Sequence, residues 1–289
     1  MDNPELQNAL QIIQYTRRSL FLTGKAGTGK STFLRHIAAT TKKKHIILAP
    51  TGIAAINAGG STLHSFFKLP FHPLLPNDTR YSIRNLRNTL KYNGEKRKLL
   101  REIELIIIDE ISMVRADMID FIDRVLRVYS GNMRFPFGGK QLLLVGDVYQ
   151  LEPVVTSDMR DILSRFYSNF YFFSARVFRE MSLVPIELQK VYRQQDERFV
   201  EVLDKIRNNT ATREELDLLN SRYLPQYEPE KDNFSITLAT RRDQVDYINE
   251  NRLSGLPGKE YTFTGTIKGD FPEGSLPTSL ELVVKIGAQ

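Results

Sequence analysis

A glycine-rich stretch near the start of the chain decides the fold, and it reads Leu20-Phe21-Leu22-Thr23-Gly24-Lys25-Ala26-Gly27-Thr28-Gly29-Lys30-Ser31-Thr32. Its first four residues predict a strand, and the residues after Lys30 predict a helix. The turn between them has the order Gly-x4-Gly-Lys-Ser, which is the pattern of a phosphate-binding P-loop when it joins a strand to a helix. This context argues against the alternative, a chance glycine-rich turn.

The residue types of the P-loop predict binding of a nucleoside triphosphate. Small residues let backbone N–H groups face the phosphates, and the helix that follows adds a favourable dipole. Lys30 is suited to neutralise the β- and γ-phosphates, and the Ser31 hydroxyl is suited to ligate magnesium. We therefore expect ATP and Mg²⁺ as cofactors, held by Gly24, Ala26, Gly27, Thr28, Gly29, Lys30, Ser31 and Thr32.

An acidic pair, Asp109-Glu110, follows the apolar run of residues 105–108. We expect Asp109 to provide the second magnesium contact and Glu110 to act as general base on the attacking water. A base beside the metal-binding aspartate indicates hydrolysis rather than transfer to a bound acceptor. The alternative is a solvated loop start, which is a common use of an acidic pair after a strand.

Two further segments supply candidate catalytic residues. Residues 144–151 form an apolar run that ends in polar residues, so in a parallel sheet its end faces the same crevice as the P-loop, and Gln150 is placed to sense the γ-phosphate. Residues 187–194 contain Arg193, which we expect to act as an arginine finger.

Short β-rich runs alternate with longer amphipathic stretches, which is typical of an α/β fold with a parallel sheet. The runs are nearly continuous in apolar residues, as a sheet covered by helices on both faces requires. An apolar stripe predicts a helix over residues 112–129, and three prolines exclude a helix interior at 68–78. The strand candidates are residues 20–23, 45–48, 105–108, 141–145 and 171–173.

The length of 289 residues exceeds the usual size of one core and predicts two domains. We expect the first at residues 1–182, with a small insertion at about 68–80, and the second at 183–289. The second shows a shorter α/β pattern, with strands at 184–188 and 235–239 and helices at 198–207, 213–221 and 241–253.

The net charge of +6 favours a polyanionic partner. If the basic stretch 80–101 is helical, Arg84, Arg87 and Lys91 share a face. That face is either a solvated helix surface or a surface that tracks phosphates, and the sequence leaves both open. The stretch is opposed only by Glu95 and contains Arg80, Arg84, Arg87, Lys91, Lys96, Arg97, Lys98 and Arg101.

Several classes are disfavoured by composition. The absence of cysteine excludes a disulfide framework and thiolate metal sites, and four histidines leave little material for zinc. No apolar run approaches the roughly 20 residues that span a bilayer. The start of the chain lacks the features of a signal peptide. We therefore expect no membrane partner and a cytoplasmic location, or a nuclear or mitochondrial one in a eukaryote.

Taken together, the motifs resemble those of superfamily-one helicases of the RecD-like group, and most closely the PIF (petite integration frequency) helicases. The resemblance covers nearly the whole chain, and its six motifs occur in order. It implies a P-loop NTPase of two RecA-like domains, the second one incomplete. The motif residues are Gly24 to Ser31, Ala49-Pro50-Thr51-Gly52-Ile53-Ala54-Ala55, Ser61-Thr62-Leu63-His64-Ser65-Phe66-Phe67, Asp109-Glu110-Ile111-Ser112-Met113, Gly146-Asp147-Val148-Tyr149-Gln150-Leu151 and Val191-Tyr192-Arg193-Gln194.

The resemblance also implies DNA contacts. Hydroxyl and backbone N–H groups suit phosphates, and aromatic rings suit base stacking. His64 as a capping or core histidine, and Phe66 as ordinary core, are the alternatives. The segment 69–78 resembles a strand-separating wedge, and Asn3 and Gln7 resemble the element that reads adenine. The implied DNA-binding residues are Pro50, Thr51, Gly52, His64, Ser65, Phe66, Thr240 and Arg241.

The function that the resemblance implies is ATP-dependent 5′ to 3′ DNA unwinding, with roles in DNA repair, recombination and telomere maintenance. The partners are single-stranded and forked or structured DNA, and we expect a monomer. The family's later motifs, Thr-x-His-Lys-x-Gln-Gly and Val-Ala-x-Ser/Thr-Arg, are absent, so we expect a fragment. The alternatives are a switch ATPase acting on a protein and a nucleotide-gated single-strand-binding module without motor activity.

Overall fold

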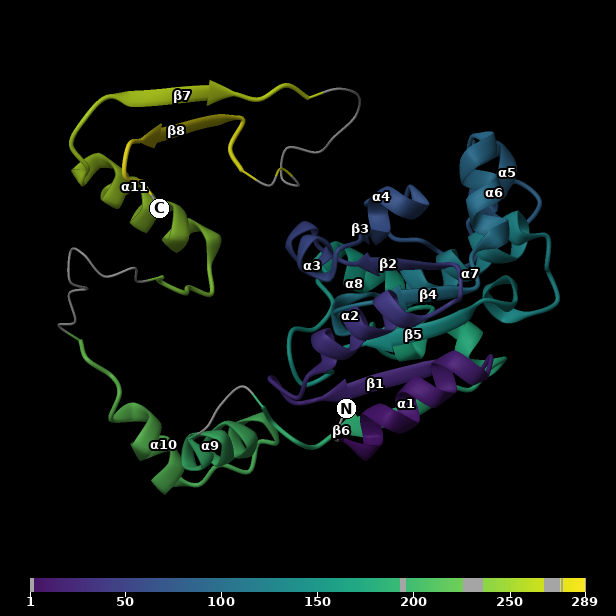
Figure 1. Cartoon of the computed structure of the whole chain (residues 1–289). Coiled ribbons are helices and arrows are strands. Elements are labelled where there is room, and N and C mark those ends of the chain that lie inside the picture. Colours follow the sequence, from purple (N-terminus) through teal and green to yellow (C-terminus); the bar gives the residue numbers. More distant parts are fainter. Residues whose placement is uncertain (1–2, 193–195, 226–235, 268–275, 277, 289) are drawn as a thin grey trace. The chain divides into compact units, whose positions relative to one another are not determined.

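Six parallel strands form one sheet in the order β3-β2-β4-β5-β1-β6 (Figure 1). The computed structural model describes residues 3–192, 196–225, 236–267, 276 and 278–288. The chain divides into two units, Met1–Ser221 and Arg222–Gln289. The strands of the sheet are β1 (Leu20–Gly24), β2 (His45–Ala49), β3 (Ser61–Thr62), β4 (Leu105–Ile108), β5 (Gln141–Val145) and β6 (Val184–Leu188).

Helices connect the strands of the first unit. Most begin at a residue whose side chain accepts a hydrogen bond from the first turn, such as Asn3 before α1 and Thr51 before α3. The helices are α1 (Pro4–Tyr15), α2 (Lys30–Thr40), α3 (Gly52–Ala58), α4 (Leu63–Phe67), α5 (Leu86–Thr89), α6 (Gly94–Glu102), α7 (Ala116–Ser130), α8 (Ser157–Leu163), α9 (Glu197–Arg207) and α10 (Arg213–Asn220). Short 3₁₀ turns lie at Thr79–Tyr81, Ile111–Met113, Pro136–Gly139, Phe172–Ser174 and Arg176–Arg179.

Alternate residues of the central strands enter two apolar cores. Ile106 and Leu144 pack in a core that contains most of α7, whereas Ile107 and Leu143 pack in a core with α1 and α2. Successive side chains of a strand point to opposite faces of the sheet. The continuous apolar runs are therefore explained by burial on both faces, as the sequence predicts.

Most of the predicted elements of the first unit are present. The strands at 20–23, 45–48, 105–108 and 141–145 are confirmed, and the helix expected at 112–129 forms as α7 after a 3₁₀ turn. The strand expected at 171–173 is wrong. Tyr171 makes only an isolated bridge to Arg115, and Phe172 is 1% exposed inside a 3₁₀ turn. Phe172 alone of these three residues enters the core, and none of them joins the sheet.

The expected boundary at residues 182 and 183 differs from the structure. β6 was assigned to the second domain, but it pairs in parallel with β1 over five positions, from Leu20↔Val184 to Gly24↔Leu188. It is thus the edge strand of the first sheet, and the first unit continues to Ser221. Hydrogen bonding to β1 decides this placement, and a strand's partner cannot be read from its own residues.

The second unit contains α11 (Arg242–Gly255) and an antiparallel pair, β7 (Glu260–Thr264) and β8 (Glu281–Lys285) (Figure 1). Lys285 ties the pair to α11 by donating to the carbonyl of Leu256 at 3.1 Å. The predicted helix at 241–253 is confirmed. The strand predicted at 235–239 is not formed in its described part, residues 236–239, where Leu238 is 91% exposed. Ser235 lies outside the described residues.

Candidate active site and nucleic-acid interface

The carboxyl ends of β1, β4 and β5 bring the predicted nucleotide-binding residues to one edge of the sheet. All three strands run in parallel, with β5 between β4 and β1. The P-loop follows β1, Asp109 follows β4, and Asp147 follows β5. Ligands bind at this edge in open α/β sheets.

The P-loop approaches its neighbours too closely for a side chain at Gly24. Gly24 has φ +145°, and an added Cβ would lie 2.7 Å from the carbonyl oxygen of Leu188. Lys30 reaches back across the loop, and its Nζ donates to the carbonyls of Gly24 and Lys25 at 2.6 and 2.9 Å. Burial lowers the pKa of Lys30, while the nearby carboxylates of Asp147, Glu110 and Asp109 act to raise it. Ser31 and Thr32 lie in the first turn of α2.

Asn3 is linked to the P-loop through Tyr192. The Tyr192 backbone N–H donates to the carbonyl of Gly27 at 2.8 Å, and the Asn3 amide lies 3.5 Å from the Tyr192 hydroxyl. Asn3 is 3% exposed, and its side-chain oxygen caps α1 by accepting from the Leu6 N–H. Gln7 is exposed on the first turn of α1. The structure thus gives Asn3 a structural use as well.

Asp109 and Glu110 follow β4 in an uncommon backbone conformation. Glu110 has φ 50°, a left-handed conformation that costs a non-glycine residue on the order of 1–3 kcal/mol and that is concentrated at functional sites. Burial raises the pKa of Asp109, opposed by a hydrogen bond from the Glu110 N–H and by Lys30. Burial and then Asp109 raise the pKa of Glu110. A carboxylate with a raised pKa is better suited to accept a proton.

A glycine lets β5 approach the segment after Glu110. An added Cβ at Gly146 would lie 3.0 Å from the backbone nitrogen and from the Cγ2 atom of Ile111. Such separations are tighter than almost all real side-chain contacts. Gly146 therefore allows Asp147 to lie beside the acidic pair.

Arg207 is a site residue that the sequence analysis missed. It donates from Nη2 to Asp147 Oδ1 at 3.0 Å and from Nε to Asp147 Oδ2 at 3.3 Å. Its guanidinium also lies 4.2 Å from the centroid of the Tyr149 ring. Asp147 is 1% exposed and also accepts from the Gln150 amide at 3.1 Å. The only available signal is that a buried carboxylate requires a partner, which does not identify the partner.

Two charged residues of α9, Asp204 and Arg207, contact the nucleotide edge. Lys25 of the P-loop pairs with Asp204 at 2.7 Å, one turn before Arg207. A cavity of about 440 Å³ lies between these elements and is lined in part by Thr23, Lys25, Tyr149 and Arg207. Helix α9 thus forms a wall of the crevice. The expected arginine finger, Arg193, lies outside the described residues.

The predicted DNA-binding residues of the first unit lie beside one another at the same sheet edge. β2 pairs in parallel with β3, so the segments that follow them, 50–52 and 63–66, are neighbours. Thr51 and Gly52 are exposed, as is Ser65, while Pro50 is half-buried. The hydroxyls of Thr51 and Thr62 cap α3 and α4.

His64 and Phe66 are both half-buried, so each combines a structural and an exposed part. The His64 ring stacks on Phe71 at 5.2 Å between centroids, and burial lowers the pKa of His64. Phe66 packs against the core, and Lys96 Nζ lies 3.0 Å from the centroid of its ring. One face of Phe66 is therefore covered by a cation.

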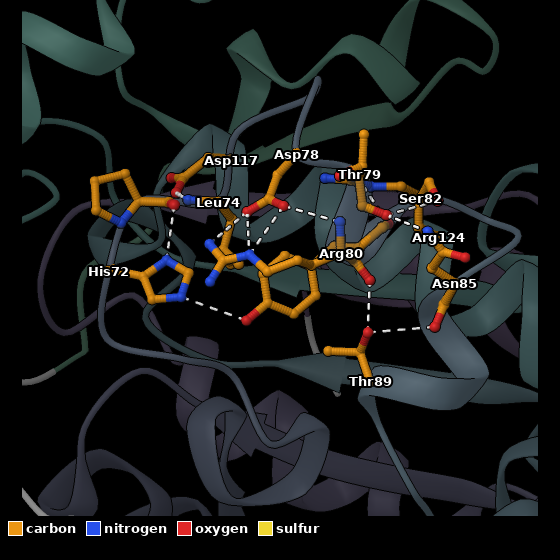
Figure 2. A network of polar contacts seen from close by, with 12 residues as sticks. His72, Leu74, Asp78, Thr79, Arg80, Ser82, Asn85, Thr89, Asp117 and Arg124 are labelled. Carbon is orange, nitrogen blue, oxygen red and sulfur yellow. Dashed lines mark hydrogen bonds and ion pairs between the residues drawn. The ribbon is translucent and has the colours of Figure 1, made fainter.

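The wedge-like segment 68–80 is anchored by polar contacts, as Figure 2 shows. The backbone N–H of Leu74 donates to buried Asp117 at 2.9 Å, and Arg80 donates to Asp78. Arg124 donates to the carbonyl of Tyr81 at 3.2 Å. Of the large apolar residues here, Leu69 and Leu74 are buried, and Phe71 is 44% exposed.

Thr240 and Arg241 lie in the second unit, immediately before α11. Arg241 forms an exposed ion pair with Asp243. Among the described residues, no helix has both the length and the apolar character needed to cross a membrane.

Comparisons with known proteins show the family to which this chain belongs. A family model described as PIF1-like helicase matches residues 5–216. The ATP-dependent DNA helicase RRM3 of Saccharomyces cerevisiae is 33% identical over 267 residues, which cover 90% of this chain and 34% of that protein. The ATP-dependent DNA helicase PIF1 of Rattus norvegicus is 33% identical over 285 residues, with 94% and 41% covered.

Solved structures with the same fold cover nearly the whole of this chain. The Pif1 helicase from Bacteroides in complex with ADP-AlF3 and ssDNA has a TM-score of 0.86 and 42% identity, over 99% of this chain and 64% of that chain. A structure of DNA unwinding at forked dsDNA by two coordinating Pif1 helicases has a TM-score of 0.85 and 41% identity, over 99% and 65%. The chain spans about a third to two fifths of the two curated relatives' length.

Proposed function

We propose, since the chain belongs to the PIF1-like helicase family, that it acts as an ATP-dependent DNA helicase that translocates 5′ to 3′ on single-stranded DNA. One observation carries this proposal. The P-loop, the acidic pair and the two segments suited to a single strand all follow parallel strands of one sheet. The nucleotide-binding and DNA-binding residues therefore lie at one edge of the same sheet. A change at the nucleotide site can then be transmitted to the DNA-binding segments through the sheet.

The nucleotide site is assigned residue by residue. Gly24, Ala26, Gly27, Thr28 and Gly29 provide the turn whose N–H groups face the phosphates. Lys30 leaves its loop carbonyls to neutralise phosphate charge, and Ser31 and Asp109 are the magnesium ligands. Bound ATP supplies the phosphoanhydride bond that is hydrolysed. Thr32 completes the first turn of α2 beside these residues.

Glu110 orients the attacking water and accepts its proton, and its raised pKa supports this role. Gln150 senses the γ-phosphate while Asp147 holds its amide. Arg193 is the arginine finger. Gln7 reads the adenine, and Asn3 positions it by capping α1.

The DNA contacts use two kinds of chemistry. Pro50, Thr51, Gly52 and Ser65 offer backbone and hydroxyl groups to the phosphates, and His64 and Phe66 offer rings for stacking. Thr240 and Arg241 of the second unit hold the DNA backbone. The comparison structure with ssDNA supports this class of partner.

The experiment is ATP turnover by this chain with and without a single-stranded oligonucleotide, together with anisotropy of the labelled oligonucleotide at low salt. Stimulated turnover is expected and supports a DNA motor. Binding without turnover would identify a nucleotide-gated single-strand-binding module. ATP turnover that is the same with and without the oligonucleotide would identify a switch ATPase.

Polarity needs a separate measurement. A translocation assay on single strands that carry a block at either end is expected to show displacement of the block at the 3′ end only. Displacement at the 5′ end would reverse the proposed direction.

A further inference from the structure

We infer that a basic pocket formed by α5, α6 and the loop between them binds backbone phosphates of the duplex portion of forked DNA. The pocket has a volume of about 260 Å³ and is lined by Arg87, Lys91, Tyr92, Arg97, Arg101 and Tyr129. None of its lining residues belongs to the nucleotide crevice or to the segments 50–52 and 63–66. The inference rests on the proposed function, which it extends from the single strand to the duplex.

The four cations of the pocket have no acidic partner among the described residues. Arg97 and Arg101 lie one turn apart on one face of α6. Arg87 donates to the backbone carbonyl of Val128 at 3.1 Å, which orients its guanidinium without neutralising it. Glu102, the acidic residue next to Arg101, pairs with Lys44 and Lys98. The positive charge of the pocket is therefore uncompensated and suits an anion.

The basic stretch 80–101 does not form one continuous helix but contains the separate helices α5 and α6. Asn93 caps α6 and separates it from the short α5, so Arg84, Arg87 and Lys91 do not lie on one continuous helix. The break instead folds two short helices around a hollow. Arg84 lies outside the pocket lining.

The aromatic lining favours duplex over single-stranded DNA. Tyr92 and Tyr129 are 6% and 5% exposed, and their hydroxyls donate to the carbonyls of Phe67 and Leu90. They form a floor and present no free ring for a base. Single-strand sites combine charge with stacking rings, whereas duplex contacts are made mostly to phosphates. Charge without a stacking surface therefore points to the duplex.

The position of the pocket in the chain fits a fork. Tyr92 bonds to Phe67, the last residue of the helix that carries His64 and Phe66. On the other side, Thr89 of α5 donates to the carbonyl of Arg80 at 2.6 Å, which joins the pocket wall to the wedge-like segment (Figure 2). A pocket joined to both is placed to hold the duplex while the separated strand lies on α3 and α4.

The test compares two double variants of this chain by anisotropy, with a labelled fork, a blunt duplex and a single strand over a range of salt concentrations. Arg97→Gln/Arg101→Gln removes two pocket cations. Arg84→Gln/Arg165→Gln removes two exposed arginines outside the pocket and is the matched control. All four substitutions are at exposed positions, and unchanged unfolding midpoints verify folding.

We expect the pocket variant to bind the fork and the duplex roughly tenfold more weakly and to reduce the log–log salt slope by about 1.8, since each phosphate contact contributes about 0.9. Its single-strand affinity and DNA-stimulated turnover stay unchanged, which separates this test from that of the proposed function. Equal losses of fork and duplex affinity in both double variants would show that surface charge in general binds the DNA, and this would contradict the assignment of the pocket. An equal loss on single strands would overturn its assignment to the duplex.

Discussion

The nucleotide crevice and the α5–α6 pocket are both rich in cations, but the cations are paired in the crevice and unpaired with any described acid in the pocket. In the crevice, Arg207 is paired with Asp147, Lys25 with Asp204, and Lys30 with two backbone carbonyls. In the pocket, no cation has an acidic partner among the described residues. The crevice is thus organised in advance by its own contacts, whereas the pocket leaves its charge for an external anion.

The largest expected effect is in the crevice. Glu110→Gln removes the proposed base and should lower ATP turnover by a factor on the order of 10²–10⁴, while nucleotide affinity is retained. Steady-state turnover and a nucleotide-binding titration measure the two quantities. Glu152→Gln changes an exposed acid in the segment after β5 and is the matched control. Normal turnover in Glu110→Gln would remove its role as base.

Loss of an internal pair should be costly where charge is buried. Arg207→Gln leaves the Asp147 carboxylate, which is 1% exposed, without its cation and should lower the free energy of unfolding by about 3 kcal/mol. Urea unfolding measures this change. Arg207→Lys keeps the positive charge but loses the two-pronged contact with Asp147. Its free energy of unfolding should therefore lie between those of the wild type and of Arg207→Gln.

The same pair predicts a dependence on pH. Burial alone would raise the pKa of Asp147, but hydrogen bonds from Arg207, Tyr149 and Gln150 lower it below 3.8 overall. A depressed carboxyl pKa stabilises the fold above pH 3.8, and that stabilisation is lost as the pH falls through the lowered pKa. The difference between the wild type and Arg207→Gln should therefore be largest near neutral pH and shrink in acid. A difference that grows in acid would contradict the assignment.

An intermediate effect is expected at the single-strand segments. His64→Ala/Phe66→Leu removes two rings and should weaken single-strand binding by about 1–3 kcal/mol per lost base stack, with nucleotide affinity unchanged. Anisotropy and a nucleotide titration measure both. Phe135→Leu changes a phenylalanine that is 54% exposed elsewhere and is the matched control. Parallel loss of both affinities would indicate damage to the core instead.

The smallest expected effect is a pH dependence of stability that comes from Lys96, which is partly buried and does not line the pocket. Burial, followed by Lys68, lowers the pKa of Lys96 to about 8. Because the folded state disfavours the charged form, the stability of the wild type relative to Lys96→Met should rise as the pH increases from about 8 to 10.5. Chemical unfolding across this range measures the change, with exposed Lys98→Met as the control. A flat difference would contradict the burial of this charge.

Local signals predicted much of the crevice. The P-loop and the acidic pair each join a strand to a following turn, so their roles depend on neighbours in sequence. The position of Gln150 beyond β5 follows from the same rule. Arg207 was missed because it lies 60 residues from Asp147, and nothing in its own segment identifies that partner. The strand predicted at 171–173 failed because apolar residues enter a core as turns as well as strands.

The sequence by itself determined the α/β class, the P-loop and the acidic residues that follow β4, because these depend on short-range periodicity and on residue chemistry at fixed spacing. Tertiary structure alone decided that β6 completes the first sheet and that Arg207 holds Asp147. It also decided that the basic stretch folds into a pocket. These features depend on which distant segments pair, and pairing is set by the free energy of packing the whole unit rather than by the preferences of any one segment.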